Sequence, residues 1–497
     1  MKNLLFRRQF LLSNREITVD KTWNTIKLSK TKKDFYLYTH PDLNCIHYEN
    51  NLFELIMLGF ALNPFQSEKN SSDILKELSL QKDLNNIIEG ANILSGRFII
   101  IYNDSQSVKL FHDATGFREV YYINANDLIA CGSTPNILLH HFQIPKDSDR
   151  EINEFYDSIE LKNHENIWFG NRTIYKNVLY LLPNHYLDLI ENKTVRFWPV
   201  KERKILKLND AAKYMAEILK GTFASAIKQF KIYQGITSGW DTRLLLAASK
   251  EYINDIHFYF IRGFKTDAHN KQSVDYLVTK EIGEKNNLPI EMIELNANII
   301  DTEFENIYYQ NNILARPILL PVYYYAYQKK LDNTLTVSGT GSNEILRLIS
   351  NINRNIDDSY AVAKAYGYQK YNYILDSINE WLKDIKYVKS LNYILIDLFN
   401  WEQMFGHWGG LSGSEQDIIR EELRVFNNRE LISTYLSLRD RCRHRDYPLG
   451  HVKIIELLSK DLLNFKMDIP KYHLKKFLRI LGVERTTDML YQWLKRL

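Results

Sequence analysis

A short stretch near the middle of the chain combines residue types that can bind phosphate. The apolar run 232–236 is typical of a buried strand, and the small and hydroxyl residues 237–239 follow it directly. An apolar helix is predicted from Asp241 to Lys250. A strand, a small-residue loop and a helix N-terminus direct backbone N–H groups and the positive end of the helix dipole at one point. The stretch therefore predicts an anion site.

Asp241 adds a second chemical requirement to this site. A carboxylate in such a loop repels phosphate unless a cation lies between them, so its position indicates a Mg²⁺ ligand. The pattern lacks Gly-Lys-Ser/Thr and is not a Walker loop. The residues predicted to hold the phosphates are Thr237, Ser238, Gly239, Trp240 and Thr242. An ordinary strand-to-helix turn is the alternative for so short a pattern.

The composition is that of a folded protein with more than one core. At 497 residues the chain is long enough for two domains, with 45% hydrophobic and 13% aromatic residues. A net charge of +4 gives no support for a nucleic-acid partner. The three cysteines are widely separated, without metal or disulfide spacing, and no segment approaches a membrane-spanning length. We expect a cytoplasmic protein with neither a nucleic-acid nor a membrane partner.

The two halves of the chain differ in their predicted elements. Residues 1–200 are β-rich, whereas strands and helices alternate from about residue 209 and favour a parallel sheet covered on both faces. A helical tail is expected after about residue 350. In the first half we expect strands at 98–102, 108–111, 120–123 and 128–131, a β group at 173–190, and helices at about 52–62 and 74–89. In the second half we expect strands at 232–236, 256–261, 291–295 and 334–337, and helices at 211–230, 241–250 and 273–287.

Motifs in both halves resemble one known family. The loop 237–242 is similar to the Ser-Gly-Gly-x-Asp-Ser loop of ATP pyrophosphatases, and the other motifs are Leu94–Phe98, Asp113–Gly116, Leu182–Tyr186 and Val337–Glu344. In this order, over roughly residues 90–345, they resemble the asparagine synthetase superfamily, which includes β-lactam synthetases and lasso peptide cyclases. The resemblance implies an N-terminal αββα sandwich of the glutaminase, Ntn-hydrolase-like type over residues 1–205. It also implies a parallel-sheet α/β ATP-pyrophosphatase domain, adenine nucleotide α-hydrolase-like, over residues 206–497.

The resemblance also implies a reaction, its cofactors and its residues. In this superfamily a carboxylate attacks ATP to give an acyl-adenylate and pyrophosphate, and an amine then forms the amide. ATP and Mg²⁺ are the implied cofactors, with Asp241, Asn343 and Glu344 as metal ligands. The remaining implied site residues are Phe260 and Ile261 near adenine or ribose, Gly339 and Gly341 in the second loop, Thr340 where the family deprotonates the amine, and Lys466 or Lys453 on pyrophosphate.

Three departures weaken parts of this assignment. The family's glutaminase uses an N-terminal cysteine, whereas this chain begins with Met1 and its first cysteine is Cys45. We therefore expect no glutaminase activity and a degenerate, scaffolding sandwich. Thr340 replaces a glutamate and is a poor base, and Asn343 replaces a metal-binding aspartate.

Two functions remain open from the sequence. The first is an AMP-forming ligase that joins a small-molecule or peptide carboxylate to ammonia or a substrate amine. The second is a non-catalytic nucleotide- or partner-binding member of the same fold. A homodimer is compatible with either, and the substrates are not encoded in any motif that we recognise.

Overall fold

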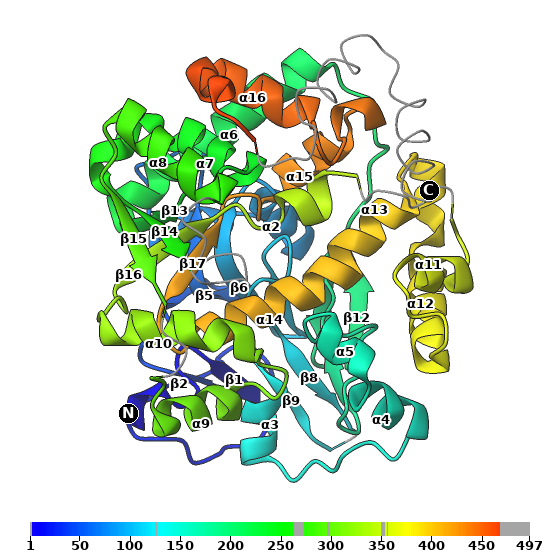
Figure 1. The fold of residues 1–497 in the computed structure, drawn as a ribbon. Helices are drawn as coiled ribbons and strands as arrows, with labels where there is room; N and C mark the ends of the chain where they lie inside the picture. The colour runs from blue at the N-terminus through cyan, green and yellow to red at the C-terminus, as the bar shows by residue number, and fades with distance from the viewer. Residues whose placement is uncertain are drawn as a thin grey trace.

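The computed structural model describes residues 2–125, 127–262, 273–295, 299–348, 353–354 and 356–467. These residues form two six-stranded antiparallel sheets in the N-terminal half and a five-stranded parallel sheet in the C-terminal half (Figure 1). The observed fold is therefore mixed α/β, with the two kinds of sheet in the halves of the chain where the sequence predicts them.

The N-terminal half is a sandwich of two sheets with helices outside. Sheet one has the order β10 (Val178–Tyr180), β8 (Tyr121–Asn124), β9 (Ile129–Gly132), β1 (Phe10–Ser13), β3 (Tyr36–Thr39), β2 (Asn24–Lys27). Sheet two has the order β12 (Lys193–Arg196), β11 (His185–Asp188), β7 (Val108–His112), β6 (Ser95–Asp104), β5 (Phe53–Leu62), β4 (Cys45–Glu49). An apolar core lies between the sheets, where alternate residues of both meet.

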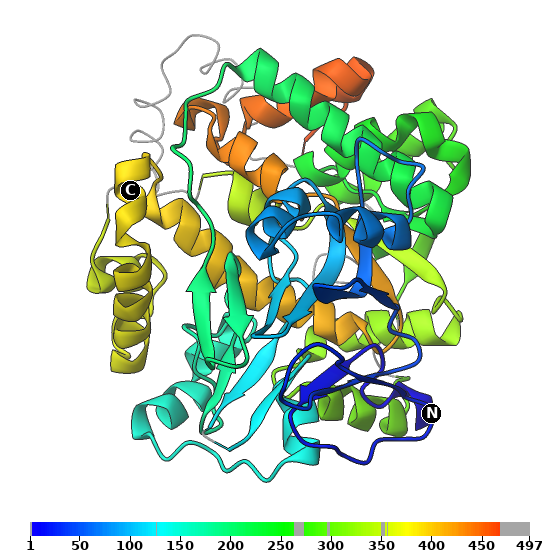
Figure 2. The same cartoon turned by 180° about the vertical axis from the view of Figure 1, so that it is seen from behind.

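Helices complete the outer layers of this sandwich. Helices α1 (Ser71–Leu78) and α2 (Leu84–Ala91) cover the outer face of sheet two. Helix α3 (Pro135–His141) packs on the outer face of sheet one. The order helix, sheet, sheet, helix is the expected αββα arrangement, seen from behind in Figure 2. Two further short helices, α4 (Arg150–Tyr156) and α5 (Ile159–Asn163), follow along the chain.

One predicted element of this half is wrong, and the helix expected at about 74–89 is divided into α1 and α2. Residues 52–62, expected as a helix, form the long strand β5, and every residue of Phe53–Leu62 is buried. Ile56 and Leu58 face the other sheet, whereas Leu55 and Met57 face α1 and α2. A strand buried on both faces loses the alternation of polar and apolar residues, so its sequence resembles that of a buried helix.

The parallel sheet has the strand order β15 (Ile290–Glu294), β14 (Ile256–Arg262), β13 (Lys231–Gly235), β16 (Thr334–Ser338), β17 (Glu421–Arg424). Helices α6 (Leu208–Gln229), α7 (Trp240–Ser249) and α16 (Leu449–Ser459) pack against one another beside it. The other helices of this unit are α8 (Val274–Asn286), α9 (Thr302–Asn311) and α10 (Leu320–Gln328). The sequence did not predict β17, which adds a strand from the predicted helical tail.

The rest of the tail is helical, as expected. Its helices are α11 (Ser359–Ala365), α12 (Asn372–Ile385), α13 (Leu395–Phe399), α14 (Gly406–Gln416) and α15 (Arg429–Leu436). A π-helical turn, Asn400–Phe405, joins α13 to α14, and together they form a rod across the centre of Figure 1. None of the described helices is both long and apolar enough to cross a membrane.

Glycines let the rod lie against the sandwich. A Cβ placed on Gly410 would come within 2.6 Å of the Glu119 side chain, and one on Gly413 within 2.6 Å of Phe117. Only a residue without a side chain permits this approach, so α14 packs directly on the sandwich segment that follows Gly116.

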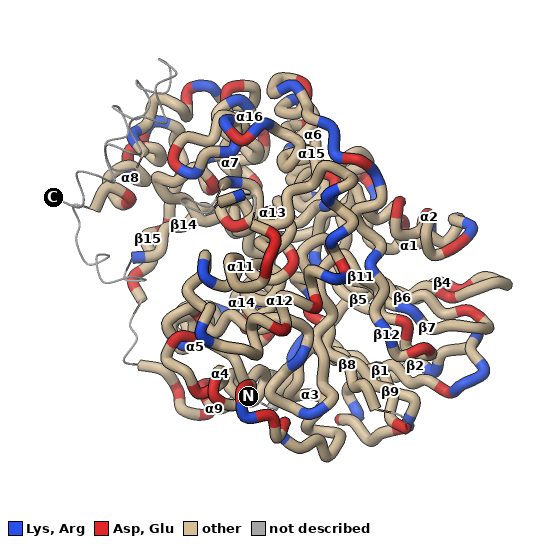
Figure 3. Tube along the Cα trace, turned by 90° about the vertical axis from the view of Figure 1, so that its right-hand side faces the viewer, with Lys and Arg blue, Asp and Glu red and all other residues tan. Residues whose placement is uncertain are grey.

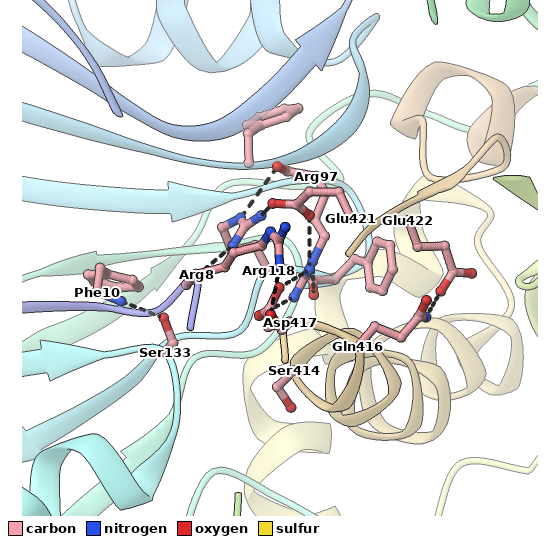
Figure 4. A network of polar contacts seen from close by, with 12 residues as sticks. Arg8, Phe10, Arg97, Arg118, Ser133, Ser414, Gln416, Asp417, Glu421 and Glu422 are labelled. Carbon is pink, nitrogen blue, oxygen red and sulfur yellow. Dashed lines mark hydrogen bonds and ion pairs between the residues drawn. The ribbon is translucent and has the colours of Figure 1, made fainter. Parts of the chain in front are cut away.

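Buried ion pairs join the sandwich to the parallel-sheet unit (Figure 4). Arg97 donates to both carboxylate oxygens of Asp417 and, at 3.1 Å, to Glu421. Arg118 also donates to Glu421, and Arg8 donates to the Asp417 carbonyl oxygen at 3.0 Å. These contacts cross more than 300 residues of sequence and fix the two units against each other. Elsewhere, residues of both charge signs are interspersed along the trace in the view of Figure 3.

Candidate functional site

The predicted phosphate loop lies where the order of the parallel strands reverses. From β13 the chain runs to β14 and β15 on one side and then returns to β16 on the other side of β13. The loops that leave the carboxyl ends of β13 and β16 are therefore neighbours at one edge of the sheet. Ligands of open parallel sheets bind at this switch point.

Three hydrogen bonds fix the conformation of the first loop. The Thr237 N–H donates to Thr242 Oγ1 at 3.2 Å, and the two threonine hydroxyl oxygens lie 2.9 Å apart. The Gly239 N–H donates to Thr237 Oγ1 at 3.2 Å. Thr242, from the first turn of α7, thus holds the loop in place.

The two donors of Ser238 already bind an anionic oxygen of the protein. The Ser238 N–H donates to Asp275 Oδ1 at 2.9 Å, and the Ser238 hydroxyl donates to the same oxygen. Asp275 lies in the first turn of α8. The sequence offers no signal for this pairing beyond the acidic residue itself. A phosphate oxygen that uses the Ser238 donors would have to replace this carboxylate.

Helix α7 begins differently from many helices of the molecule. Its N-cap is Gly239, which has no side chain to accept hydrogen bonds from the first N–H groups. Other helices are capped by the side chains of Asn70, Asp83, Thr134, Asp301 and Asn428. A glycine cap leaves the positive end of α7 open to an external anion.

The second predicted loop meets the first at Asp241. A Cβ on Gly339 would lie 2.8 Å from the Asp241 Cβ, so glycine permits the contact. Gly341 has φ of 101° and turns the chain into a short π-helical segment, Ser342–Leu346. The Ser342 hydroxyl then donates to Asp241 Oδ1 at 2.7 Å.

Asp241 is paired with the cationic side chain of Arg347 and lies at the end of a buried series of hydrogen bonds. Arg347 Nη2 lies 3.0 Å from both carboxylate oxygens. Ser342 Oγ is hydrogen-bonded to His451 Nε2, and the Tyr435 hydroxyl to His451 Nδ1 at 2.6 Å. Burial holds the pKa of His451 well below its usual value, so this imidazole is neutral. No motif in the sequence indicates Arg347 or this series of hydrogen bonds.

These contacts decide how well the three predicted metal ligands fit Mg²⁺. Asp241 is already neutralised by Arg347, and a second cation on the same oxygens would be repelled. Glu344 Oε2 accepts the Gly341 N–H at 2.9 Å. Burial, followed by the charge of Asp241, raises the pKa of Glu344. In this arrangement the donor set of Asp241, Asn343 and Glu344 does not fit a protein-held Mg²⁺.

Thr340 is connected to a carboxylate that sequence reasoning missed. Its Oγ1 lies 3.1 Å from Ser338 Oγ, and Ser338 also donates to Glu422 of β17. Glu422 is buried and accepts a further hydrogen bond from Gln416 at the end of α14. Glu422 is therefore the nearest base that the hydroxyl pair can reach.

The other predicted residues do not converge on the loop with their side chains. Trp240 is buried, and its indole N–H donates to the Asp446 carbonyl at 2.9 Å. Phe260 is buried against Tyr276, whereas Ile261 lines a cavity beside α10.

The cationic candidates have different surroundings. Lys453 pairs with Glu456 at 2.9 Å on its own helix, and Lys466 has an exposed side chain. Arg243 donates to the backbone carbonyls of Ser238 and Lys466, so it ties the loop to the segment after α16.

The sandwich offers little reactive chemistry of its own. Burial raises the pKa of the Cys45 thiol to about 11, which makes a reactive thiolate unfavourable. Among the described residues, one group of three possible metal ligands converges: His47, Glu49 and Glu54. His47 is paired with Glu54 and Lys30 with Glu49, so these carboxylates already have partners.

Comparisons with known proteins give no assignment. No protein-family model and no curated protein matches the chain. Among solved structures, glutamine PRPP amidotransferase from B. subtilis, complexed with ADP and GMP, matches 61% of this chain and 90% of its own at 8% identity, with a TM-score of 0.25. An allosteric regulatory enzyme of purine biosynthesis matches 61% and 63% at 10% identity, with a TM-score of 0.25.

A third solved structure matches the chain less extensively. The NH3-dependent NAD synthetase from Campylobacter jejuni, in complex with nitrate, covers 39% of this chain and 96% of its own at 15% identity, with a TM-score of 0.20. Likenesses this weak carry no argument about this chain, and the site must be judged from its own residues.

Proposed function

We propose that this chain is an ATP-dependent ligase that activates a carboxylate as its adenylate and transfers the acyl group to ammonia or a substrate amine. The observation that carries the proposal is the glycine-capped α7 at the sheet's switch point, with Asp241 in its first turn. The resemblance of the loops to those of the asparagine synthetase superfamily agrees with this reaction. Cysteine placement in the sandwich favours ammonia or an amine over glutamine as the nitrogen source.

In the first step the carboxylate oxygen attacks the α-phosphorus of ATP, and the bond to the β-phosphate breaks to release pyrophosphate. The N-terminus of α7 would stabilise the charge of the departing pyrophosphate. Arg347 would supply a positive charge close to the same point. It reaches Asp241 through one nitrogen, so a phosphate oxygen can compete for the guanidinium group.

In the second step the amine nitrogen attacks the acyl carbon and AMP leaves. The amine must lose a proton, and Thr340 is a weak base. The hydroxyl pair Thr340–Ser338 leads to the Glu422 carboxylate, which would accept this proton.

A nucleotide-binding module without catalysis is the second candidate. The Asp241–Arg347 ion pair favours it, because Arg347 already neutralises this carboxylate and opposes a metal ion at the same oxygens. Both candidates share the same binding loop and differ in whether ATP is split.

The test is release of AMP and pyrophosphate from ATP, with and without Mg²⁺, in the presence of ammonia and a panel of carboxylates. The ligase predicts AMP formation that depends on the carboxylate and falls about 100-fold in Asp241→Ala, because Asp241 positions Arg347 and Ser342 beside the N-terminus of α7. Asp255→Ala, an exposed aspartate shortly after the same helix, is the matched control and should keep full activity. Binding of ATP without AMP release would support the module instead.

A further inference from the structure

A cavity of about 210 Å³ lies between the parallel sheet and helix α10, away from the phosphate loop. Tyr233 of β13, Tyr259 and Ile261 of β14, and Tyr325 of α10 line it, together with Arg420. Helix α10 lies beside the parallel strands in Figure 1. None of the loop residues 237–242 contributes to this cavity, so it is a separate place in the fold.

Arg420 is the unusual member of the lining. Its side chain is buried, with the residue only 6% exposed, and its Nε has no hydrogen-bond partner among the described residues. The two carboxylates near Arg420 already have hydrogen-bond partners of their own. Glu291, on the cavity wall, is bonded to His257 and Tyr325, and Glu422 is bonded to Ser338 and Gln416.

A buried guanidinium group without a counter-ion cannot become neutral by losing its proton, since its pKa is too high. It needs an anion, and its planar set of N–H donors matches the two oxygens of a carboxylate. A buried arginine that lines a cavity and is bonded to no carboxylate of the described residues is therefore complementary to an external carboxylate.

The other residues that line the cavity indicate the size and polarity of the rest of the ligand. Three tyrosine rings surround the space, and Ile261, Ile293, Val322 and Leu331 add aliphatic surface. A single exposed cation, Lys329, contributes to the lining from the surface and lies 5.6 Å from the Tyr325 ring. The volume corresponds to about seven water molecules or roughly ten non-hydrogen atoms. Such a pocket suits a small acid with an aromatic or branched apolar body.

We infer that this cavity binds a small apolar carboxylate, whose acid group pairs with Arg420 while its body packs among Tyr233, Tyr259 and Tyr325. The inference does not depend on the proposed ligase reaction. Either can fail alone, because the two sites share no residue.

Binding to the purified full chain tests the inference. Phenylacetate, 4-hydroxyphenylacetate and isovalerate would be titrated by calorimetry and by thermal shift, with phenylacetamide as the uncharged match. The expected result is that at least one acid binds at least tenfold more tightly than the amide. In Arg420→Gln this preference should disappear, and Val322→Trp, which fills the cavity, should abolish binding.

Arg150→Gln is the matched control, because that side chain is 88% exposed and outside the cavity. It should bind as the unchanged protein does. Absence of any acid-selective binding across the panel would overturn the inference. So would acid binding that survives both Arg420→Gln and Val322→Trp.

Discussion

Arg97 and Arg420 are both buried, but the structure surrounds them in opposite ways. Arg97, at 1% exposure, meets Asp417 and Glu421 and joins the sandwich to the parallel-sheet unit. Arg420, at 6%, lines a cavity, and its Nε–H donates to none of the described residues. The buried charge of Arg97 therefore holds the two units together. The buried charge of Arg420 is instead available to pair with an external anion.

Glu119 extends this comparison to an acid. It is buried beside Gly410, accepts a hydrogen bond from Tyr121, and leaves Oε2 without a partner among the described residues. Burial raises its pKa to about 8, so it becomes neutral instead of finding a counter-ion. Arginine has no such option. Arg97 is thus a buried charge with counter-ions, and Glu119 is a buried acid in its neutral form. Arg420 is a buried charge without an ion pair among the described residues.

The largest expected effect is from Arg97→Met. The substitution leaves Asp417 buried without its main cation, which we expect to cost about 3–5 kcal/mol of unfolding free energy. The measurement is urea denaturation followed by circular dichroism and tryptophan fluorescence. Arg150→Met, at the surface, should change stability by less than about 0.5 kcal/mol. Equal stability of the two variants would remove the distinction between paired and exposed arginines.

Glu119→Gln should show an intermediate effect that depends on pH. Because the folded-state pKa is raised, the acid's favourable contribution is complete below pH 4.5 and is lost as pH rises to about 8. Glutamine imitates the protonated acid and does not titrate. We expect no difference from the unchanged protein below pH 4.5 and a gain that grows between pH 4.5 and about 8, by at most about 1.4 kcal/mol per pH unit. Denaturation midpoints across this range measure it, and a constant difference would refute the assignment.

Arg420→Met should have the smallest effect when no ligand is added. Arg420 forms no ion pair with the described residues, so its removal leaves none of their carboxylates without a counter-ion, and we expect stability within about 1 kcal/mol of the unchanged protein, or above it. The same denaturation experiment compares it directly with Arg97→Met. A loss as large as that of Arg97→Met would mean that Arg420 is paired within the protein.

The sequence predicted the elements around the loop because their patterns are local. The apolar run before Thr237 and the helix after Gly239 lie within two residues of the predicted bounds. The strand β5 was mistaken for a helix because burial on both faces removes its alternation. Strand β17 was missed because four residues, Glu421–Arg424, carry three charges, and only its neighbours in the sheet make it a strand.

The hydrogen-bond and ion-pair partners of the site residues could not be predicted from local sequence patterns. Asp241 is joined to Arg347, 106 residues away, and to Ser342, and Ser238 is joined to Asp275, 37 residues away. No spacing rule connects such residues before the strands are assembled. Residue types can nominate an anion site, but the charge balance within it depends on tertiary contacts.

The most direct measurement is calorimetric binding of ATP and of inorganic pyrophosphate to the full chain, which requires no knowledge of the carboxylate. The account predicts one site at which pyrophosphate competes with ATP, weakened about tenfold in Thr242→Val because the Thr237 N–H loses its acceptor. Thr279→Val, at a buried threonine whose hydroxyl has no partner among the described residues, should bind normally. Absence of ATP binding, or ATP binding that pyrophosphate does not compete with, would contradict the account.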